Sequence, residues 1–348
     1  MVSTTELGPA DIDAAADRVR GRVRPVLVSR ASGASRFSRG DAGPDGAPPF
    51  RADGGGEVWL ALEFLQHTGS FKARGALNFL HAHRAAGTLT RAGVTLASGG
   101  NAGLAGAWAA AALGVPASVF LPASAPAVKV TRLKGYGADV HLVDGEYAHA
   151  AAACADFADR TGALRAHAYD DPYIAAGAGT LLDEILDRVP GLDTVLVAVG
   201  GGGLFAGVAT AAHRRGVRTV AVEPANCPTL HAALEAGRPV DVPVSGVAAD
   251  ALGARRATPL ALSAARRADT RSVLVPDRAV DAARRTLWDE WRLVTEHGGA
   301  TALACLLDDG SGRSAYAPAP GERTAVVLCG ANTDPSDLVR PGAARDAT

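Results

Sequence analysis

Two segments of this chain repeat one plan: a β-branched apolar run, a glycine turn, an Ala-rich helical stretch, Gly-Val, a second apolar run and a proline. The first is TLASGGNAGLAGAWAAAALGVPASVFLP and the second is LVAVGGGGLFAGVATAAHRRGVRTVAVEP. At one constant separation, Gly100, Gly114, Val115 and Pro122 correspond to Gly202, Gly216, Val217 and Pro224. This plan predicts two βαβ units, whose helices begin at the carboxyl ends of strands, where open α/β sheets bind ligands. A ligand with two anionic parts would suit such a pair, although unrelated βαβ units can also share a register.

The same alternation of apolar runs and helical stretches continues along the chain. The runs predicted as buried strands are GVTLAS, ASVFLP, ADVHLVD, DTVLVAVG, VRTVAVEP and RTAVVLCGAN. The stretches predicted as helices include VKVTRLKGYG, YAHAAAACADFADRTG, AAGAGTLLDEILDRV and AVDAARRTLWDEWRLV. Strands that alternate with helices indicate parallel sheets and an α/β fold. The chain has 348 residues, and at about 150 residues per domain this length suggests two domains.

Charge and composition exclude several classes of partner. The chain carries 35 basic and 36 acidic side chains without a long run of one sign, so we expect no nucleic-acid partner. The first twenty residues carry several acidic side chains, so we expect no secretion signal. No stretch of about 18 consecutive residues is apolar throughout, so we expect no membrane partner. The chain has four cysteines, Cys154, Cys227, Cys305 and Cys329, and no two of them form a CxxC pair. This pattern indicates neither a disulfide framework nor a structural zinc site, and it favours the reducing cytoplasm. Residues 32–56 are rich in Gly, Ser, Asp and Pro, and we expect a long flexible surface loop there.

Four consecutive glycines follow the predicted strand DTVLVAV. In Gly200, Gly201, Gly202 and Gly203, successive backbone N–H groups can converge on one anion, and the dipole of the next helix favours negative charge. The run therefore predicts a phosphate-binding turn, although glycines after a strand also serve tight turning alone. The lysine of a nucleotide P-loop and the spacing of a dinucleotide fingerprint are both missing, which argues against ATP and NAD.

A lysine stands in the segment HTGSFKARGA, directly after the apolar run VWLALEFL. Lys72 is expected to open a helix with Phe71 beside it. If its amine is buried against the aromatic ring, its pKa falls, as imine chemistry with an aldehyde requires. The segment alone also fits a surface lysine at a helix start.

The motifs TGSFKARGA, SGGNAG, GGGG and LCGAN, in this order, resemble the pyridoxal-phosphate enzymes of fold type II, the group that is similar to tryptophan synthase beta. The chain is most similar to the serine/threonine dehydratases, over nearly its whole length after the N-terminal loop. The resemblance implies two open parallel α/β domains with the cofactor in the cleft between them. It divides the chain into a discontinuous large cofactor-binding domain, 1–85 plus 168–348, and a small domain, 93–167.

The resemblance also implies roles for single residues. Lys72 forms the covalent link to pyridoxal 5′-phosphate and acts as the general base, Phe71 packs on the ring, and Gly200 to Gly203 hold the phosphate. Asn101 binds the ring 3′-oxygen, and the loop Ser98, Gly99, Gly100 and Asn101 receives the carboxylate of the amino-acid substrate. Cys329 faces the ring nitrogen, although without the motif it would be interpreted as a small buried apolar residue.

The implied activity is dehydration of L-serine or L-threonine to a 2-oxo acid and ammonia. Three alternatives stay open: a β-replacement synthase of the cysteine or cystathionine type, a hydroxyaspartate dehydratase, and a non-enzymatic amino-acid sensor. Racemases of this fold carry a serine after the position of Ser98, whereas this chain has Gly99, so we expect little racemase activity. Arg24-Pro25 and Glu296-His297 depart from the family pattern and leave the substrate preference open. The resemblance also implies a homodimer.

The stretch EPANCPTL resembles the region where relatives bind a cation. Glu223 is the implied side-chain ligand, and Cys227 is implied to offer its carbonyl oxygen. Thr229 replaces the carboxylate of the relatives that bind divalent ions. A monovalent cation, or none, is therefore expected.

Overall fold

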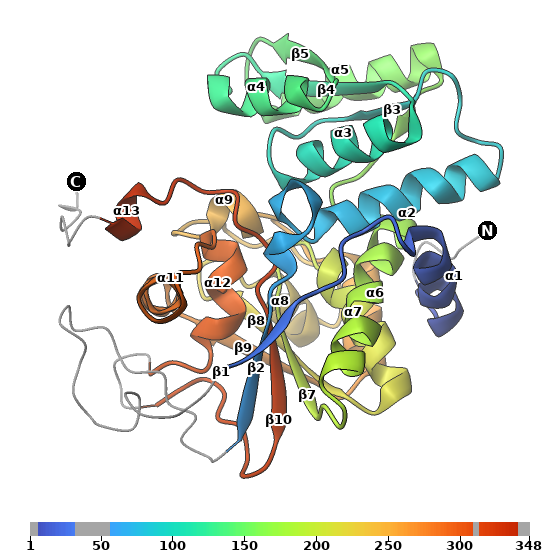
Figure 1. Cartoon of the computed structure of the whole chain (residues 1–348). Helices are drawn as coiled ribbons and strands as arrows, with labels where there is room; N and C mark the ends of the chain where they lie inside the picture. The colour runs from blue at the N-terminus through green and yellow to red at the C-terminus, as the bar shows by residue number, and fades with distance from the viewer. Residues whose placement is uncertain (1–5, 32–55, 309–312, 340–348) are drawn as a thin grey trace.

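The structure is a computed structural model that describes residues 6–31, 56–308 and 313–339. The predicted flexible loop over residues 32–56 lies outside the described residues, apart from Gly56. The described chain forms an α/β fold with two separate sheets (Figure 1). No described helix is both long enough and apolar enough to cross a membrane.

The larger sheet has six strands in the order β1-β2-β10-β7-β8-β9. Their bounds are β1 (Val28–Ala31), β2 (Glu57–Ala61), β7 (Thr194–Ala198), β8 (Arg218–Pro224), β9 (Thr270–Val275) and β10 (Arg323–Val327). β1 runs antiparallel to β2, and every other pair is parallel. All residues of β7 are buried, because a central parallel strand is covered by helices on both faces.

Helices cover both faces of the larger sheet. The described helices of this half are α1 (Pro9–Val19), α6 (Pro172–Arg188), α7 (Gly203–Arg215), α8 (Thr229–Ala236), α9 (Ala249–Leu252), α10 (Pro259–Arg267), α11 (Asp277–Trp291), α12 (His297–Ala304) and α13 (Ser336–Val339). On one face α7 packs against α6 and α10, with α1 on α6; on the other, α12 packs on the sheet and against α11 (Figure 1).

The smaller sheet has four parallel strands in the order β5-β4-β3-β6. Their bounds are β3 (Val94–Leu96), β4 (Ala117–Pro122), β5 (Asp139–Val143) and β6 (Leu164–Arg165), and the helices between them are α3 (Asn101–Leu113), α4 (Ala127–Gly135) and α5 (Tyr147–Thr161). α3 and α4 connect strands in one direction and α5 in the other, so right-handed crossovers place α5 on the opposite face. Helix α2 (Lys72–Ala85) joins the two halves by packing against both α3 and α6.

Each sheet has a point where the direction of its connections reverses. In the larger sheet this point lies between β7 and β10, and in the smaller sheet it lies between β3 and β6. Open α/β sheets bind ligands outside the carboxyl ends of the strands at such points. The topology therefore offers two binding positions, one at each sheet.

A buried ion cluster fixes the segment around α2. The Arg74 guanidinium, which is fully buried, donates to Glu63 at 2.7 Å and to Glu184 at 2.6 Å. Glu63 belongs to the short 3₁₀ turn η1 (Glu63–Leu65), and Glu184 lies in α6, where its second carboxylate oxygen also accepts the N–H of Val26. The cluster joins three elements that surround the start of α2.

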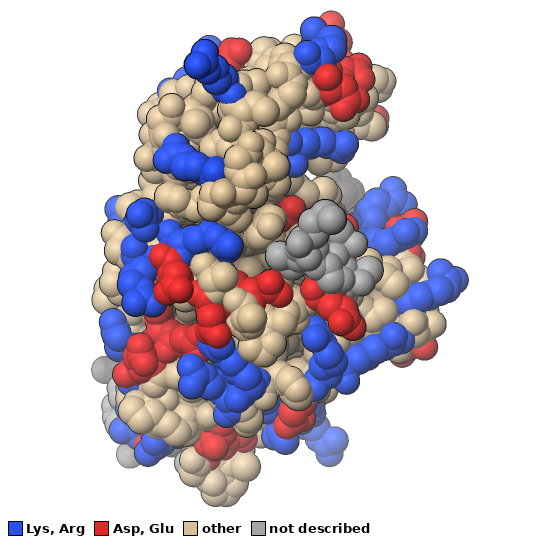
Figure 2. Space-filling view, turned by 90° about the vertical axis from the view of Figure 1, so that its right-hand side faces the viewer, with Lys and Arg blue, Asp and Glu red and all other residues tan. Residues whose placement is uncertain are grey.

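Charges of both signs share the surface of the molecule (Figure 2). On the face shown in Figure 2, Lys and Arg lie interspersed with Asp and Glu over the lower part of the molecule, and the upper part carries fewer charges. This face therefore carries no extended field of one sign that would attract a nucleic acid.

Candidate active site

Lys72 opens α2, as predicted, and its amine is enclosed. The residue keeps some exposed surface, but its Nζ donates to the carbonyl oxygen of Ala168 at 3.0 Å and lies 4.9 Å from the centre of the Phe71 ring. Burial lowers the pKa of the Lys72 amine to about 8. At pH 7 about a tenth of this amine is therefore uncharged and nucleophilic, far more than for a lysine with an ordinary pKa of about 10.

The four glycines connect β7 to α7 in a bend that excludes side chains. A Cβ on Gly201 would lie 2.2 Å from the Tyr169 ring, and one on Gly203 would lie 2.7 Å from the Tyr169 carbonyl oxygen. Gly202 precedes α7 with a φ of 95°, a left-handed conformation that favours glycine. The bend thus presents backbone at the N-terminus of a long helix, an arrangement suited to an anion.

Cys329 follows β10 and lies beside the lysine segment. The N–H of Phe71 donates to the Cys329 carbonyl at 3.0 Å, and Ser70 forms an antiparallel bridge with Gly330. The Cys329 thiol is buried and donates to the Gly298 carbonyl at 3.6 Å. Burial raises the pKa of this thiol to about 12, so it stays neutral.

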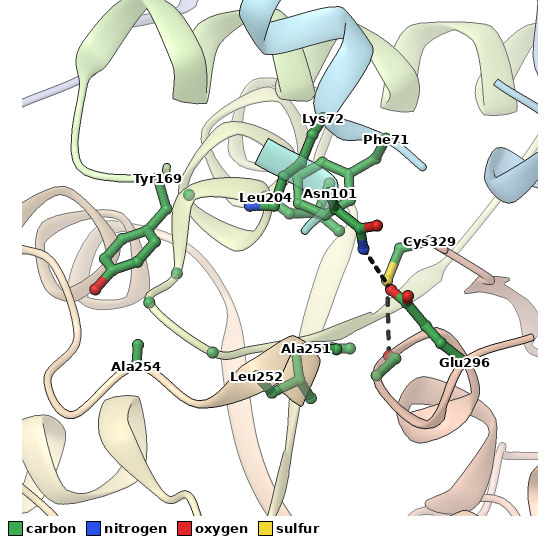
Figure 3. A pocket seen from close by; sticks show the side chains of 16 residues that line it. Phe71, Lys72, Asn101, Tyr169, Leu204, Ala251, Leu252, Ala254, Glu296 and Cys329 are labelled. Atoms are coloured by element: carbon green, nitrogen blue, oxygen red, sulfur yellow. Dashed lines mark hydrogen bonds between the residues drawn. The ribbon is translucent and has the colours of Figure 1, made fainter. Parts of the chain in front are cut away.

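Asn101, the first residue of α3, reaches across from the smaller sheet to Glu296. Its Nδ2 donates to Glu296 Oε1 at 2.7 Å, and the two side chains point toward each other near Cys329 (Figure 3). Burial raises the pKa of Glu296 to about 7, against the lowering effects of the Asn101 hydrogen bond and the Lys72 charge. A Cβ on Gly330 would lie 2.2 Å from Glu296 Oε1, so this carboxylate needs glycine at position 330.

These residues line one pocket. It brings together the predicted Phe71, Lys72, Asn101, Gly200, Gly201, Gly202, Gly203 and Cys329. It also contains Tyr169, Leu252 and Glu296, which the sequence argument gave no role in the site (Figure 3). The pocket lies at the carboxyl ends of β7 and β10, at the reversal point of the larger sheet.

The predicted substrate loop lies next to this pocket. Gly99 and Gly100 line a neighbouring depression that also includes Asn101 and Glu296. Ser98 lines a separate crevice of about 530 Å³ with Tyr147, Arg165 and His167. That crevice lies at the carboxyl ends of β3 and β6, the reversal point of the smaller sheet.

His167 connects this crevice to the lysine. Its Nδ1 accepts the N–H groups of Tyr169 at 3.3 Å and Asp170 at 2.8 Å, so the ring proton lies on Nε2. Burial lowers the pKa of the imidazole, which is therefore neutral at pH 7. The next residue, Ala168, is the acceptor of the Lys72 amine.

Glu223 and Cys227 lie at the N-terminus of α8. The buried Glu223 carboxylate accepts the N–H of Leu230 at 2.7 Å and the N–H of His231 at 2.8 Å. The Cys227 thiol donates to the Ser245 carbonyl at 3.3 Å, and its own carbonyl accepts the N–H of Thr229. Among the described residues, no cluster of three or more His, Cys, Asp or Glu side chains has a metal-binding arrangement.

Comparison with known proteins decides the family. Residues 46–330 match the sequence profile of the family described as "Pyridoxal-phosphate dependent enzyme". This chain belongs to that family.

Comparisons of this pyridoxal-phosphate-dependent enzyme with individual proteins agree with the family assignment. It is 37% identical over 283 residues to an L-threonine ammonia-lyase of Geobacter sulfurreducens, a match that covers 80% of this chain and 67% of the relative. It is 36% identical to a phenylserine dehydratase of Ralstonia pickettii, covering 82% of this chain and 86% of that one. The structure of maize serine racemase superposes with a TM-score of 0.83 at 27% identity, covering 96% of both chains. The two-sheet arrangement is therefore fold type II, as expected.

Two polar residues at the pocket, Glu296 and Tyr169, and the nearby Asn332 carried no predicted role. Glu296 was noted only as a departure from the family pattern, and Tyr169 had no sequence signal at all. The remaining clue was in the motif LCGAN, whose last residue, Asn332, was quoted without a role. Glu296, Tyr169 and Asn332 all lie next to site residues that are distant in the sequence, and local sequence patterns do not reveal such contacts.

Proposed function

We propose that this enzyme is an L-serine/L-threonine ammonia-lyase, which removes water from a hydroxyamino acid and releases a 2-oxo acid and ammonia. The relatives named L-threonine ammonia-lyase and phenylserine dehydratase support dehydration as the reaction class. The observation that carries the proposal is the enclosed Lys72 amine, which faces the same pocket as the four-glycine bend.

The residues of the pocket fit pyridoxal 5′-phosphate. A phosphate suits the glycine bend, because backbone N–H groups and the start of α7 attract an anion where a Cβ would collide with Tyr169. An aldehyde suits Lys72, because an amine with a pKa of about 8 is partly neutral at pH 7. When bound, the cofactor withdraws electrons from the α-carbon of the amino acid and so acidifies its proton.

Lys72 is the residue that moves the proton in this proposal. Its amine faces the pocket with a pKa close to the range that suits a general base, and the carbonyl of Ala168 orients the Nζ atom. The Phe71 ring covers the amine on one side and limits the access of water. Asn101 and the backbone of Ser98 to Gly100 offer donors for the cofactor and for the substrate carboxylate at the start of α3.

The neutral Cys329 thiol supports elimination over reactions that need a long-lived carbanion. Its raised pKa keeps negative charge away from the wall of the pocket, and it offers a weak donor in place of a carboxylate. Such a donor would do little to keep the ring nitrogen of a bound cofactor protonated. We therefore propose that the β-hydroxyl leaves promptly after the α-proton is removed.

The test is to load purified protein with pyridoxal 5′-phosphate and to measure ammonia and 2-oxo acid with L-serine and L-threonine, with Lys72→Ala as the control. Equal amounts of the two products from the wild type, and none from the variant, are expected. Serine consumption without ammonia in the presence of sulfide or homocysteine would instead indicate a β-replacement synthase. Binding of serine without any 2-oxo acid would indicate a sensor.

One observation favours hydroxyaspartate as a second candidate substrate. Arg165 lines the crevice beside Ser98 and His167, and none of the bonds found among the described residues involves its guanidinium. Thr95 and Arg165 are paired across β3 and β6, which places both side chains on the α5 side of the sheet. A second carboxylate on the substrate would find Arg165 and the Nε2–H of His167 there. A kcat/KM for 3-hydroxyaspartate above that for serine, lost in Arg165→Gln, would support this candidate.

Several further expectations accompany the proposal. We propose that residues 93–167 form the small domain and that the enzyme acts in the cytoplasm as a homodimer. All four cysteines are free and buried, as suits a reducing compartment. A monovalent cation near Glu223 and the Cys227 carbonyl stays a prediction, which the thermal stability in potassium against tetramethylammonium chloride would test.

A further inference from the structure

Asn332, which ends the motif LCGAN, contacts four separate parts of the site. Its Nδ2 donates to Asn101 Oδ1 at 2.6 Å and to the Thr68 carbonyl at 2.8 Å. Its Oδ1 accepts from the Arg132 guanidinium at 2.5 Å. Its backbone N–H lies near the Glu296 carboxyl group and acts to lower the pKa of that group. Both donors and the acceptor of the carboxamide are therefore engaged.

The contact with Asn101 fixes which atoms Asn101 presents to the pocket. Asn332 occupies Asn101 Oδ1, and Glu296 accepts one N–H of Asn101 Nδ2. Because a carboxamide has two N–H groups, one donor of Asn101 remains for a ligand in the pocket. If the carboxamide were flipped, it would present its oxygen there and repel an anionic oxygen.

The contact with Thr68 supports the turn that precedes Lys72. Thr68 has a φ of 64°, a left-handed conformation that is unfavourable for a β-branched residue. A Cβ on Gly69 would lie 2.9 Å from Asn332 Oδ1, so the turn approaches Asn332 closely. A hydrogen bond to the Thr68 carbonyl stabilises this strained conformation four residues before the lysine.

The contact with Arg132 crosses from the larger sheet to the smaller one. Arg132 lies in α4, whereas Asn332 follows β10. On the same helix, Lys129 pairs with Asp250 at 3.5 Å, a second link across the two halves. The position of α4 is therefore tied to the carboxamide that orients Asn101.

We propose that Asn332 is a positioning residue, which orients the Asn101 carboxamide and the turn before Lys72. Its hydrogen bond with Arg132 links it to the smaller sheet. The inference rests on the proposed function only in that Asn101 and Lys72 face the cofactor. It goes beyond that function, because it assigns a role to a residue that lines the neighbouring depression and not the pocket around Lys72.

The main test is Asn332→Asp, which preserves size, the backbone N–H and the acceptor for Arg132. The carboxylate cannot donate to Thr68 or to Asn101, and the Asn101 carboxamide is expected to flip. We expect an altered ratio of the visible to the near-ultraviolet absorption band of the bound cofactor, and a roughly tenfold or greater loss of pyridoxal phosphate affinity. The kcat should fall by about 10²-fold, with a smaller change in KM. Asp17→Asn, the reverse exchange at an exposed position of α1 outside the pocket, is the control.

Two further variants separate positioning from mere folding. The double variant of Asn332→Asp with Asn101→Ala should lose less cofactor affinity than the product of the single losses, because the two residues act together. Arg132→Gln should weaken cofactor binding roughly two- to tenfold. Lys134→Gln, on the same helix, should leave it unchanged.

The outcomes distinguish this inference from the proposed function. If Asn332→Asp showed the wild-type spectrum and cofactor affinity, or if it lowered only the melting temperature of the cofactor-free protein, the inference would be wrong. If the wild type released no ammonia from any hydroxyamino acid, the proposed function would fail. The spectrum and the affinity of Asn332→Asp would still test the role of Asn332.

Discussion

The N–H of Phe71 donates to the carbonyl of Cys329 at 3.0 Å, so a residue near the end of the described chain lies against the lysine segment. Ser70 and Gly330 form the adjacent bridge. This short pairing is the reason that the thiol of Cys329, which follows β10, and the amine of Lys72, which opens α2, line the same pocket. Backbone contacts therefore position the segment that carries the Lys72 amine.

The pKa of Lys72 predicts how the cofactor attaches. Only the neutral amine attacks an aldehyde, and its pKa is lowered to about 8. The rate at which cofactor-free protein binds pyridoxal phosphate should therefore rise with pH and level off above about 8. Stopped-flow absorbance over a pH series measures this rate. A rate that keeps rising toward about pH 10, the range of an ordinary lysine, would contradict the burial of the amine.

The bend at Gly201 predicts a sharp effect of one methyl group. In Gly201→Ala the Cβ would meet the Tyr169 ring at 2.2 Å, and the bend must open. Cofactor affinity should fall by 10²-fold or more, measured by fluorescence titration, since the converging N–H groups act together. Gly135→Ala in α4 is the matched control, because a Cβ there meets nothing within 4 Å. Unchanged affinity in Gly201→Ala would mean that the anion binds elsewhere.

Gly99 predicts that racemisation is slow. A second acid or base on the far side of the cofactor is needed to return a proton, and Gly99 offers no side chain. Chiral chromatography should find no rapid formation of D-serine from L-serine. Gly99→Ser should gain measurable racemisation once Leu121 adjusts, because the new Cβ would lie 2.9 Å from Leu121 Cδ2. Fast racemisation by the wild type would refute this role of Gly99.

The buried Arg74 cluster predicts a large loss of stability. Arg74→Ala leaves Glu63 buried without its partner, which should cost about 3–5 kcal/mol in the free energy of unfolding. Arg20→Ala removes an exposed pair with Asp17 and should cost no more than about 1 kcal/mol. Urea unfolding of the two variants measures both values. Similar losses in both would show that the Arg74 cluster is not a structural centre.

The sequence predicted most of the fold because its buried parallel strands are continuous β-branched runs. β4, β7, β8 and β10 were all found in this way, and helices α4, α5, α6 and α11 had clear patterns. β1 and β9 were not predicted, since both are edge strands with exposed positions and weak apolar patterns. These strands become visible only through their partners in the sheet.

The residues of the site likewise fall into those that the sequence predicted and those that it did not. Lys72 and the four glycines lie in local motifs whose chemistry is evident from neighbouring residues. Glu296 and Asn332 gain their roles from contacts with Asn101, which belongs to the smaller sheet. Such contacts depend on how the two halves pack, and no spacing in the sequence encodes them.

The most direct test of the central claim is to locate the covalent bond to the cofactor. Protein loaded with pyridoxal phosphate would be reduced with borohydride and digested, and the modified peptide identified by mass spectrometry. The pyridoxyl group is expected on Lys72, and Lys72→Ala is expected to carry none. Modification of a different lysine, or an unmodified Lys72 in fully loaded protein, would contradict the central claim.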